Sequence, residues 1–208
     1  MNLPTKEECY DLLRQYHVPE HIIGHSEAVA KVAVFLARKL NEKGEQVNTD
    51  LVERACLLHD ILKIIEIKSY DDNYFTEKPT QEDIRFWNKL KEKYKGVRHE
   101  DAAYELLKDR YPGLARVILK HKYAEVHYGS LDTWEEKLVH YADKRVMHRK
   151  IVSLKKRFEE GHNRYKQTHP EYYEKGEHNE VDKACFELEK EIFNKLGISP
   201  DEVKINAL

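Results

Sequence analysis

The chain has 208 residues, enough for one compact domain with a single buried core. Its 36 Lys and Arg nearly balance 38 Asp and Glu, and the net charge of -2 excludes a global electrostatic attraction for nucleic acid or membranes. The three cysteines are far apart and form no CxxC motif, which argues against a disulfide framework or a thiolate zinc site. No signal peptide or long apolar run is visible, so we expect a cytoplasmic protein without a membrane anchor.

Helical periodicity runs through almost every segment, and Gly and Pro fall mainly between segments. The sequence therefore predicts an all-α helical bundle. Capping residues and prolines mark the expected helix starts, with Thr49 as one of the caps. The expected helices span about residues 5–16, 19–44, 49–66, from 80, from 98, 112–122, 131–158, 178–196 and from 199 onward.

The expected second helix carries a histidine on its apolar stripe. His25 lies three residues after Ile22 and four before Val29, so it faces the core. For a single inward histidine, a core imidazole satisfied by hydrogen bonds is the more common explanation.

The third helix strengthens the functional interpretation, because His59 and Asp60 stand together in the apolar run CLLHDILK. A buried carboxylate is rare without a partner charge or a metal ion. Asp143 repeats the pattern between Val139 and Val146 on the long later helix. Three helices thus direct imidazole or carboxylate groups inward.

His99 and His121 also occur at helical spacing from apolar residues and are expected to face inward. A set of nitrogen and oxygen ligands without thiolate suits Mn, Fe, Zn, Co or Ni, and contains too much imidazole for magnesium or calcium. We expect one or two such divalent ions.

The ordered pattern of His25, His59-Asp60 and Asp143 resembles the HD superfamily of metal-dependent phosphohydrolases. HDILK is similar to the HDIGK form of the family motif, with Leu62 in place of Gly. GHSEAVAKVA resembles the first-histidine helix and LVHYADKR the last-aspartate helix of that family. The resemblance covers about residues 20–149.

This resemblance implies an HD-type bundle over residues 1–208, with a core at about 19–157 and a C-terminal helical extension at 158–208. It also implies that one metal is bound by His25, His59, Asp60 and Asp143. His99 and His121 match the extra histidines of members with a dinuclear centre, in which the aspartate of the HD pair bridges both ions.

The implied activity is hydrolysis of a phosphate ester or anhydride bond of a nucleotide or dinucleotide by a metal-activated hydroxide. Asp60 and Lys63 are the expected catalytic residues. Lys63 lies on the same helical side as His59 and Asp60, where its ammonium could reach a phosphate, although a solvated or ion-paired lysine is the alternative. Arg149 matches an arginine of bacterial dinucleoside tetraphosphate hydrolases in this superfamily, so Lys63 and Arg149 are the expected substrate-binding residues.

Other functions stay open. Residues 144–166 hold nine Lys and Arg against two Glu, a basic strip that favours an RNA or cyclic-dinucleotide phosphodiesterase if it is more than a solvated helix face. A non-catalytic metal- or nucleotide-binding protein is the third possibility. Tyr70, Tyr74 and Phe75 either stack on a base or pack locally.

The expected partner is a small phosphorylated substrate, and a nucleotide is favoured over nucleic acid. No membrane association is expected. A homodimer is possible on the sequence alone. Two further histidines are candidate neighbours of the site. His140 is the expected partner of the ligands because it precedes Asp143 by three residues, and His21 has a structural or supporting role.

Overall fold

A computed structural model describes residues 2–70, 75–168 and 177–203, and it confirms the all-α class. The α-helices are α1 (Lys6–Gln15), α2 (Glu20–Glu42), α3 (Thr49–Leu58), α4 (Gln81–Lys93), α5 (His99–Leu107), α6 (Pro112–Leu119), α7 (Trp134–Arg145), α8 (Leu154–Thr168) and α10 (Glu177–Leu196). The described residues also form the short 3₁₀ helices η1 (Lys63–Glu66), η2 (Tyr123–Val126) and η3 (Pro200–Glu202). One antiparallel hairpin joins β1 (Val146–Met147) to β2 (Lys150–Ile151).

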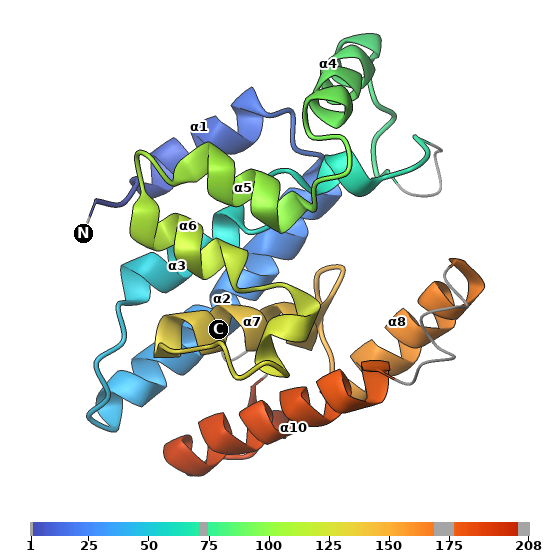
Figure 1. The fold of residues 1–208 in the computed structure, drawn as a ribbon. Coiled ribbons are helices and arrows are strands. Elements are labelled where there is room, and N and C mark those ends of the chain that lie inside the picture. The colour runs from blue at the N-terminus through green and yellow to red at the C-terminus, as the bar shows by residue number, and fades with distance from the viewer. Residues whose placement is uncertain (1, 71–74, 169–176, 204–208) are drawn as a thin grey trace.

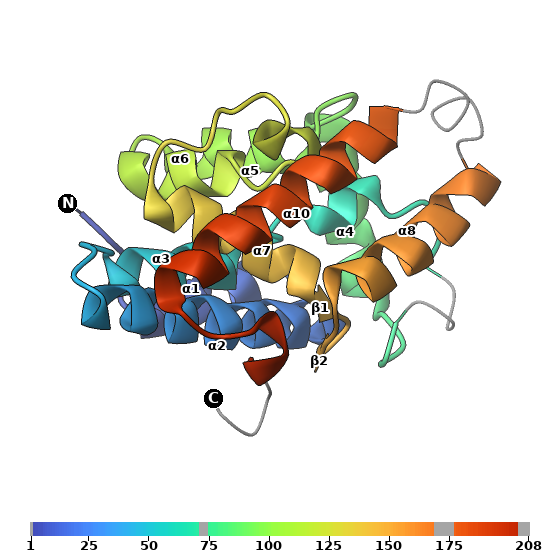
Figure 2. The ribbon, with the colours of Figure 1, turned by 90° about the horizontal axis from the view of Figure 1, so that it is seen from below.

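The long helix α2 is the centre of the bundle and packs against both α3 and α7 (Figure 1). Helices α5 and α6 form an adjacent pair, and α10 crosses α7 on the face seen from below (Figure 2). The predicted apolar stripe of α2, from Ile22 to Leu40, is buried. This packing places the first turns of α2, which carry His25, beside the C-terminal ends of α3 and α7.

Local capping explains where several helices begin. Thr5 and Thr80 both form capping boxes, with Glu8 and Asp83 respectively, at two of the predicted helix starts. The expected cap at Thr49 was wrong: the Asn48 side chain accepts the hydrogen bond from the backbone N–H of Leu51, and Thr49 is already the first helical residue.

The third helix is shorter than predicted, because α3 ends at Leu58 rather than continuing through Glu66. The ring Nδ1 of His59 donates to the carbonyl oxygen of Cys56 at 2.7 Å. In a continuing helix that carbonyl would accept from the backbone N–H of Asp60. The chain instead turns through tighter bonds between residues three apart, which lead into η1.

The long helix predicted over residues 131–158 is also wrong, because α7 ends at Arg145 and the hairpin precedes α8. β-Branched Val146 and Ile151 face each other across the hairpin, a pairing that favours strands. His148 adopts a left-handed conformation in its turn, with φ of 58°. The break turns the backbone back toward α2.

Within the described ranges, none of the helices combines the length and hydropathy needed to cross a lipid bilayer.

Candidate metal centre

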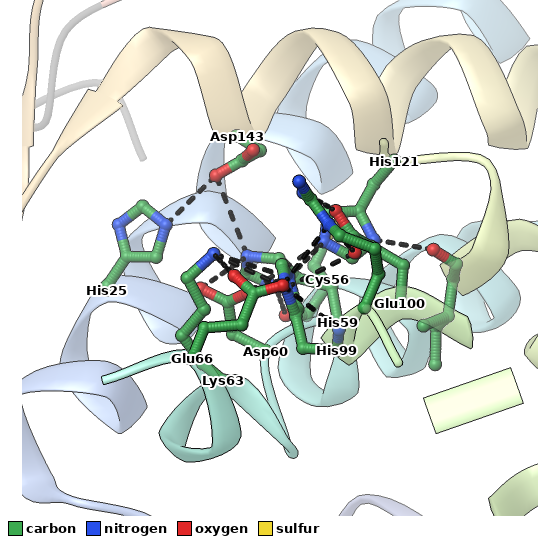
Figure 3. Close-up of polar contacts among 12 residues, drawn as sticks. His25, Cys56, His59, Asp60, Lys63, Glu66, His99, Glu100, His121 and Asp143 are labelled. Atoms are coloured by element: carbon green, nitrogen blue, oxygen red, sulfur yellow. Dashed lines mark hydrogen bonds and ion pairs between the residues drawn. The ribbon is translucent and has the colours of Figure 1, made fainter. Parts of the chain in front are cut away.

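The six predicted ligands converge on one place in the bundle, although they come from five helical segments (Figure 3). They are His25 in α2, His59 and Asp60 after the end of α3, His99 at the start of α5, His121 after the end of α6, and Asp143 in α7. His59, His99 and His121 are at most 3 % exposed, whereas Asp60, His25 and Asp143 are partly accessible. The cluster is therefore mostly buried, with three of its six side chains partly accessible to solvent.

Each of the four imidazoles donates its Nδ1 hydrogen away from the cluster centre. Three of these hydrogen bonds go to backbone carbonyls: His25 to His148 at 3.0 Å, His59 to Cys56 at 2.7 Å and His121 to Ile118 at 2.5 Å. A neutral imidazole carries one N–H, so its Nε2 then offers a lone pair. All four Nε2 atoms contact atoms of the other cluster residues, as in histidines that bind metal.

The first half of the cluster consists of His25, His59 and Asp143, with one oxygen of Asp60. The Oδ1 atom of Asp143 lies 3.0 Å from Nε2 of His25 and 3.6 Å from Nε2 of His59. The Nε2 atom of His59 is also 3.6 Å from Oδ2 of Asp60. Among the described residues this buried nitrogen has no hydrogen-bond partner.

The second half consists of His99, His121 and the other oxygen of Asp60. Oδ1 of Asp60 lies 3.0 Å from Nε2 of His99 and 3.8 Å from Nε2 of His121. The two Nε2 atoms face each other at 3.2 Å. Asp60 therefore divides its two oxygens between the halves.

These features fit divalent metal ions. In the neutral imidazoles, the facing Nε2 atoms of His99 and His121 present their lone pairs to each other, and Nε2 of His59 is buried without a hydrogen bond to any described residue. Both arrangements are costly, and a cation would stabilise both. His25, His59 and Asp60, and separately Asp60, His99 and His121, have ligand atoms within 4.8 Å of one another. The nitrogen and oxygen donors could hold a transition metal.

Glu66 and Glu100 belong to the site but were missed in the sequence. Glu66 Oε1 lies 3.0 Å from Nδ1 of His99, and Glu100 Oε2 lies 3.3 Å from the same atom. Both carboxylates pair with this ring nitrogen, which leaves Nε2 of His99 facing Asp60. The signal available was weak, because two glutamates among 38 acidic residues do not stand out without knowing how the chain turns after Asp60.

The charges of the cluster hold its carboxylates ionised. Burial by itself would raise the pKa of Asp60, but the charge of His59 in its protonated form and that of Lys63 outweigh it and keep that pKa well below its usual range. For Asp143, burial is likewise outweighed, here first by Lys144, and the pKa is lowered. Burial lowers the pKa of His121 to about 4, so this imidazole is neutral at pH 7.

Lys63 reaches the second half of the cluster. Its Nζ atom lies 3.4 Å from both ring nitrogens of His99 and 3.4 Å from Oε2 of Glu66. Burial opposes its charge, but Asp60 and Glu66 raise its pKa, so the ammonium persists. With about a third of its side chain exposed, Lys63 is more accessible than any of the six cluster residues.

Arg149 lies outside the cluster. Its guanidinium donates to the carbonyl and the carboxylate of Glu20, at 3.0 and 2.7 Å, and is half exposed. It rests on Gly24, where a Cβ atom would come within 2.0 Å of Nε of Arg149. Only a glycine permits this approach beside His25.

The predicted basic strip is not a continuous surface. Lys144 and Arg145 are 8 and 3 % exposed. Arg145 donates to the carbonyl oxygens of Val152 and Pro200 and pairs with Glu189. Exposed basic residues begin only at the hairpin and continue along α8.

The aromatic residues of the loop before α4 pack locally where they are described. Phe75 stacks on Trp87 with ring centroids 5.5 Å apart, and Tyr70 lies 5.5 Å from the same indole. Phe75 also contacts His21, whose pKa is lowered by burial. Tyr74 lies outside the described residues.

His140 supports the site in a different way from the predicted one. It is fully buried, but its Nδ1 lies 3.3 Å from the carbonyl of Lys120 rather than against Asp143. It therefore contacts the backbone that leads to His121.

A family model described as HD domain matches residues 22–147, which is more than half of the chain. The chain belongs to the HD domain family. All six cluster residues lie inside the matched region of this HD domain, whereas Arg149 follows it.

A curated relative, a tRNA (cytidine(56)-2'-O)-methyltransferase from Thermoplasma volcanium, is 36 % identical to the HD-domain protein over 59 residues. The matched segment is 28 % of this chain and only 16 % of the relative. No solved structure gives a significant match.

Proposed function

We propose that this HD-domain protein is a metal-dependent phosphohydrolase that cleaves a phosphate ester or anhydride bond of a nucleotide or dinucleotide. The observation that carries the proposal is the division of Asp60 between two groups of inward Nε2 atoms. Such an arrangement suits two neighbouring ions bridged by one carboxylate. Candidate metals are Mn, Fe, Zn, Co and Ni.

The proposed ligands are His25, His59, Asp60 and Asp143 for one ion, and Asp60, His99 and His121 for the other. When bound, such ions supply Lewis acidity toward a phosphoryl oxygen and activate water near neutral pH. Asp60 fixes the spacing of the two halves because it contacts both.

Lys63 and Arg149 are the proposed substrate-binding residues. The partly exposed side chain of Lys63 lies beside the cluster, where its ammonium would bind a phosphoryl oxygen and stabilise the charge that develops during cleavage. Arg149 would exchange the carboxylate of Glu20 for a second phosphate, because both are bidentate acceptors for a guanidinium. A substrate with two or more phosphates would use both residues.

An RNA phosphodiesterase is the second candidate. It is favoured by the partial likeness to an enzyme whose name specifies tRNA and by the exposed basic residues of α8. The net charge of -2 favours the small nucleotide.

Hydrolysis of nucleoside phosphates, dinucleoside polyphosphates and short single-stranded RNA at about 50 and 200 mM salt separates the candidates. The metal-reconstituted protein is expected to cleave the small substrates with a gentle salt dependence, because only a few charges contact them. Cleavage of RNA alone, with binding that collapses over this range, would favour the second candidate. No hydrolysis with any of the five metals would leave a non-catalytic binding role.

A further inference from the structure

Lys144 is a buried charge beside the cluster that the proposed reaction does not use. Lysine is almost never buried without a compensating partner, because desolvation of the ammonium costs several kcal/mol. The residue is only 8 % exposed. Its Nζ atom donates to Oδ2 of Asp143 at 2.9 Å and to the carbonyl oxygen of His121 at 2.7 Å.

The first of these bonds assigns separate tasks to the two oxygens of Asp143. Oδ2 is held by Lys144, while Oδ1 faces the Nε2 atoms of His25 and His59. A carboxylate held in this way presents one oxygen to an ion rather than two.

The second bond connects the two halves of the cluster. The carbonyls of Lys120 and His121 follow the last turn of α6, where no helical N–H is available to them. On α7, His140 contacts the first carbonyl at 3.3 Å and Lys144, four residues later on the same face, binds the second. Helix α7 thereby holds the segment that carries His121.

We infer that Lys144 is a positioning residue that aligns the two halves: it restricts Asp143 to one ligand oxygen and holds His121 in place opposite Asp60. The inference rests on the proposed metal centre. It concerns metal binding directly, so activity is not needed to test it.

The test compares Lys144→Met with wild type in chelator-treated protein titrated with Co²⁺, following the dissociation constants of both ions and the visible d–d absorption. We expect about 10–100-fold weaker binding of both ions, as for other residues that orient ligands, and altered d–d bands. Lys137→Met is the matched control, because Lys137 lies on the same helix and pairs with Glu191 away from the cluster.

Lys144→Gln separates charge from position, because the amide can still donate hydrogen bonds and avoids an apolar group beside Asp143. Lys144→Gln should therefore bind the ions more tightly than Lys144→Met. The circular dichroism and unfolding temperature of the apoprotein show whether each variant folds. If Lys144→Met does not fold, Lys144→Gln still tests the inference. If both Lys144 variants bind two ions with wild-type dissociation constants and spectra, the inference about Lys144 is overturned, whereas the proposed metal centre is not. A wild-type protein that takes up no ion would overturn the metal centre, and this inference with it.

Discussion

The two halves of the candidate metal centre are built from different kinds of local structure. His25 and Asp143 lie inside α2 and α7, long helices that pack directly on each other. His99 is the first residue of α5, and His121 follows the last turn of α6. Helix packing therefore places His25 and Asp143 of the first half, whereas the second half depends more on individual contacts: ion pairs of His99 with Glu66 and Glu100, and the hydrogen bond from Lys144 to the His121 carbonyl.

This comparison predicts that replacing a ligand residue removes only the ion bound by its own half of the cluster. Asp60, which contributes to both halves, is the exception. Asp60→Ala should abolish retention of both ions because each half uses one of its oxygens. His25→Ala should remove one ion and His99→Ala the other. Metal analysis after dialysis measures each outcome, with His127→Ala as control, since His127 contacts Tyr128 outside the cluster. Equal metal content in all variants would show that the cluster is not the binding site.

Lys63→Ala should leave both ions in place but slow turnover by about 10²-fold, the usual cost of losing one group that stabilises transition-state charge. The ammonium contacts His99 and Glu66 without belonging to either set of ligands. Single-turnover rates and metal content, measured on the same sample, check this. An unchanged rate with every cleaved substrate would return Lys63 to the role of an ion-paired lysine.

Glu66→Gln should weaken only the second ion, by about 10–100-fold, because Glu66 orients His99 and does not contact His25 or Asp143. Sequential dissociation constants from calorimetry separate the two ions. Glu105→Gln is a suitable control, since Glu105 is exposed and pairs with Lys108. Equal weakening of both ions would contradict the assignment of Glu66 to the second half alone.

The smallest expected effect concerns the stability of the apoprotein in acid. Burial opposes ionisation of Glu100, but His99 and Arg98 outweigh it and lower its pKa from 4.5 to about 2. A lowered folded-state pKa stabilises the protein above about pH 4.5, and this contribution is lost as the pH falls toward 2.

Glu100→Gln should therefore reduce the loss of unfolding free energy between about pH 5 and 3, by on the order of 1–3 kcal/mol. Urea titrations of metal-free wild type and variant measure the difference. Parallel stability profiles for the two proteins would show that Glu100 does not contribute.

The difference between ligands inside regular helices and ligands at helix ends also explains what the sequence could and could not predict. His25 and Asp143 stand on regular apolar stripes, so helical periodicity alone indicated that they face inward. The helical class followed from the same periodicity. The shortening of α3 was not predictable, because it depends on the His59 ring taking the Cys56 carbonyl.

The hairpin and the outer carboxylates were missed for a related reason. The hairpin is fixed by long-range contacts such as that of the His148 carbonyl with His25, which no local pattern encodes. Glu66 and Glu100 acquire their roles only after the chain turns at Asp60 and brings η1 against α5. Arg149 was predicted from family resemblance, and its role in substrate binding stays a prediction.

The most direct test of a two-part metal centre is a crystal structure of the protein reconstituted with Mn²⁺, with anomalous scattering used to locate the ions. Two peaks are expected, one among His25, His59, Asp60 and Asp143 and the other among Asp60, His99 and His121. A single peak confined to one half would contradict the shared role of Asp60. Peaks only elsewhere, or none at full Mn²⁺ loading, would contradict the metal centre as a whole.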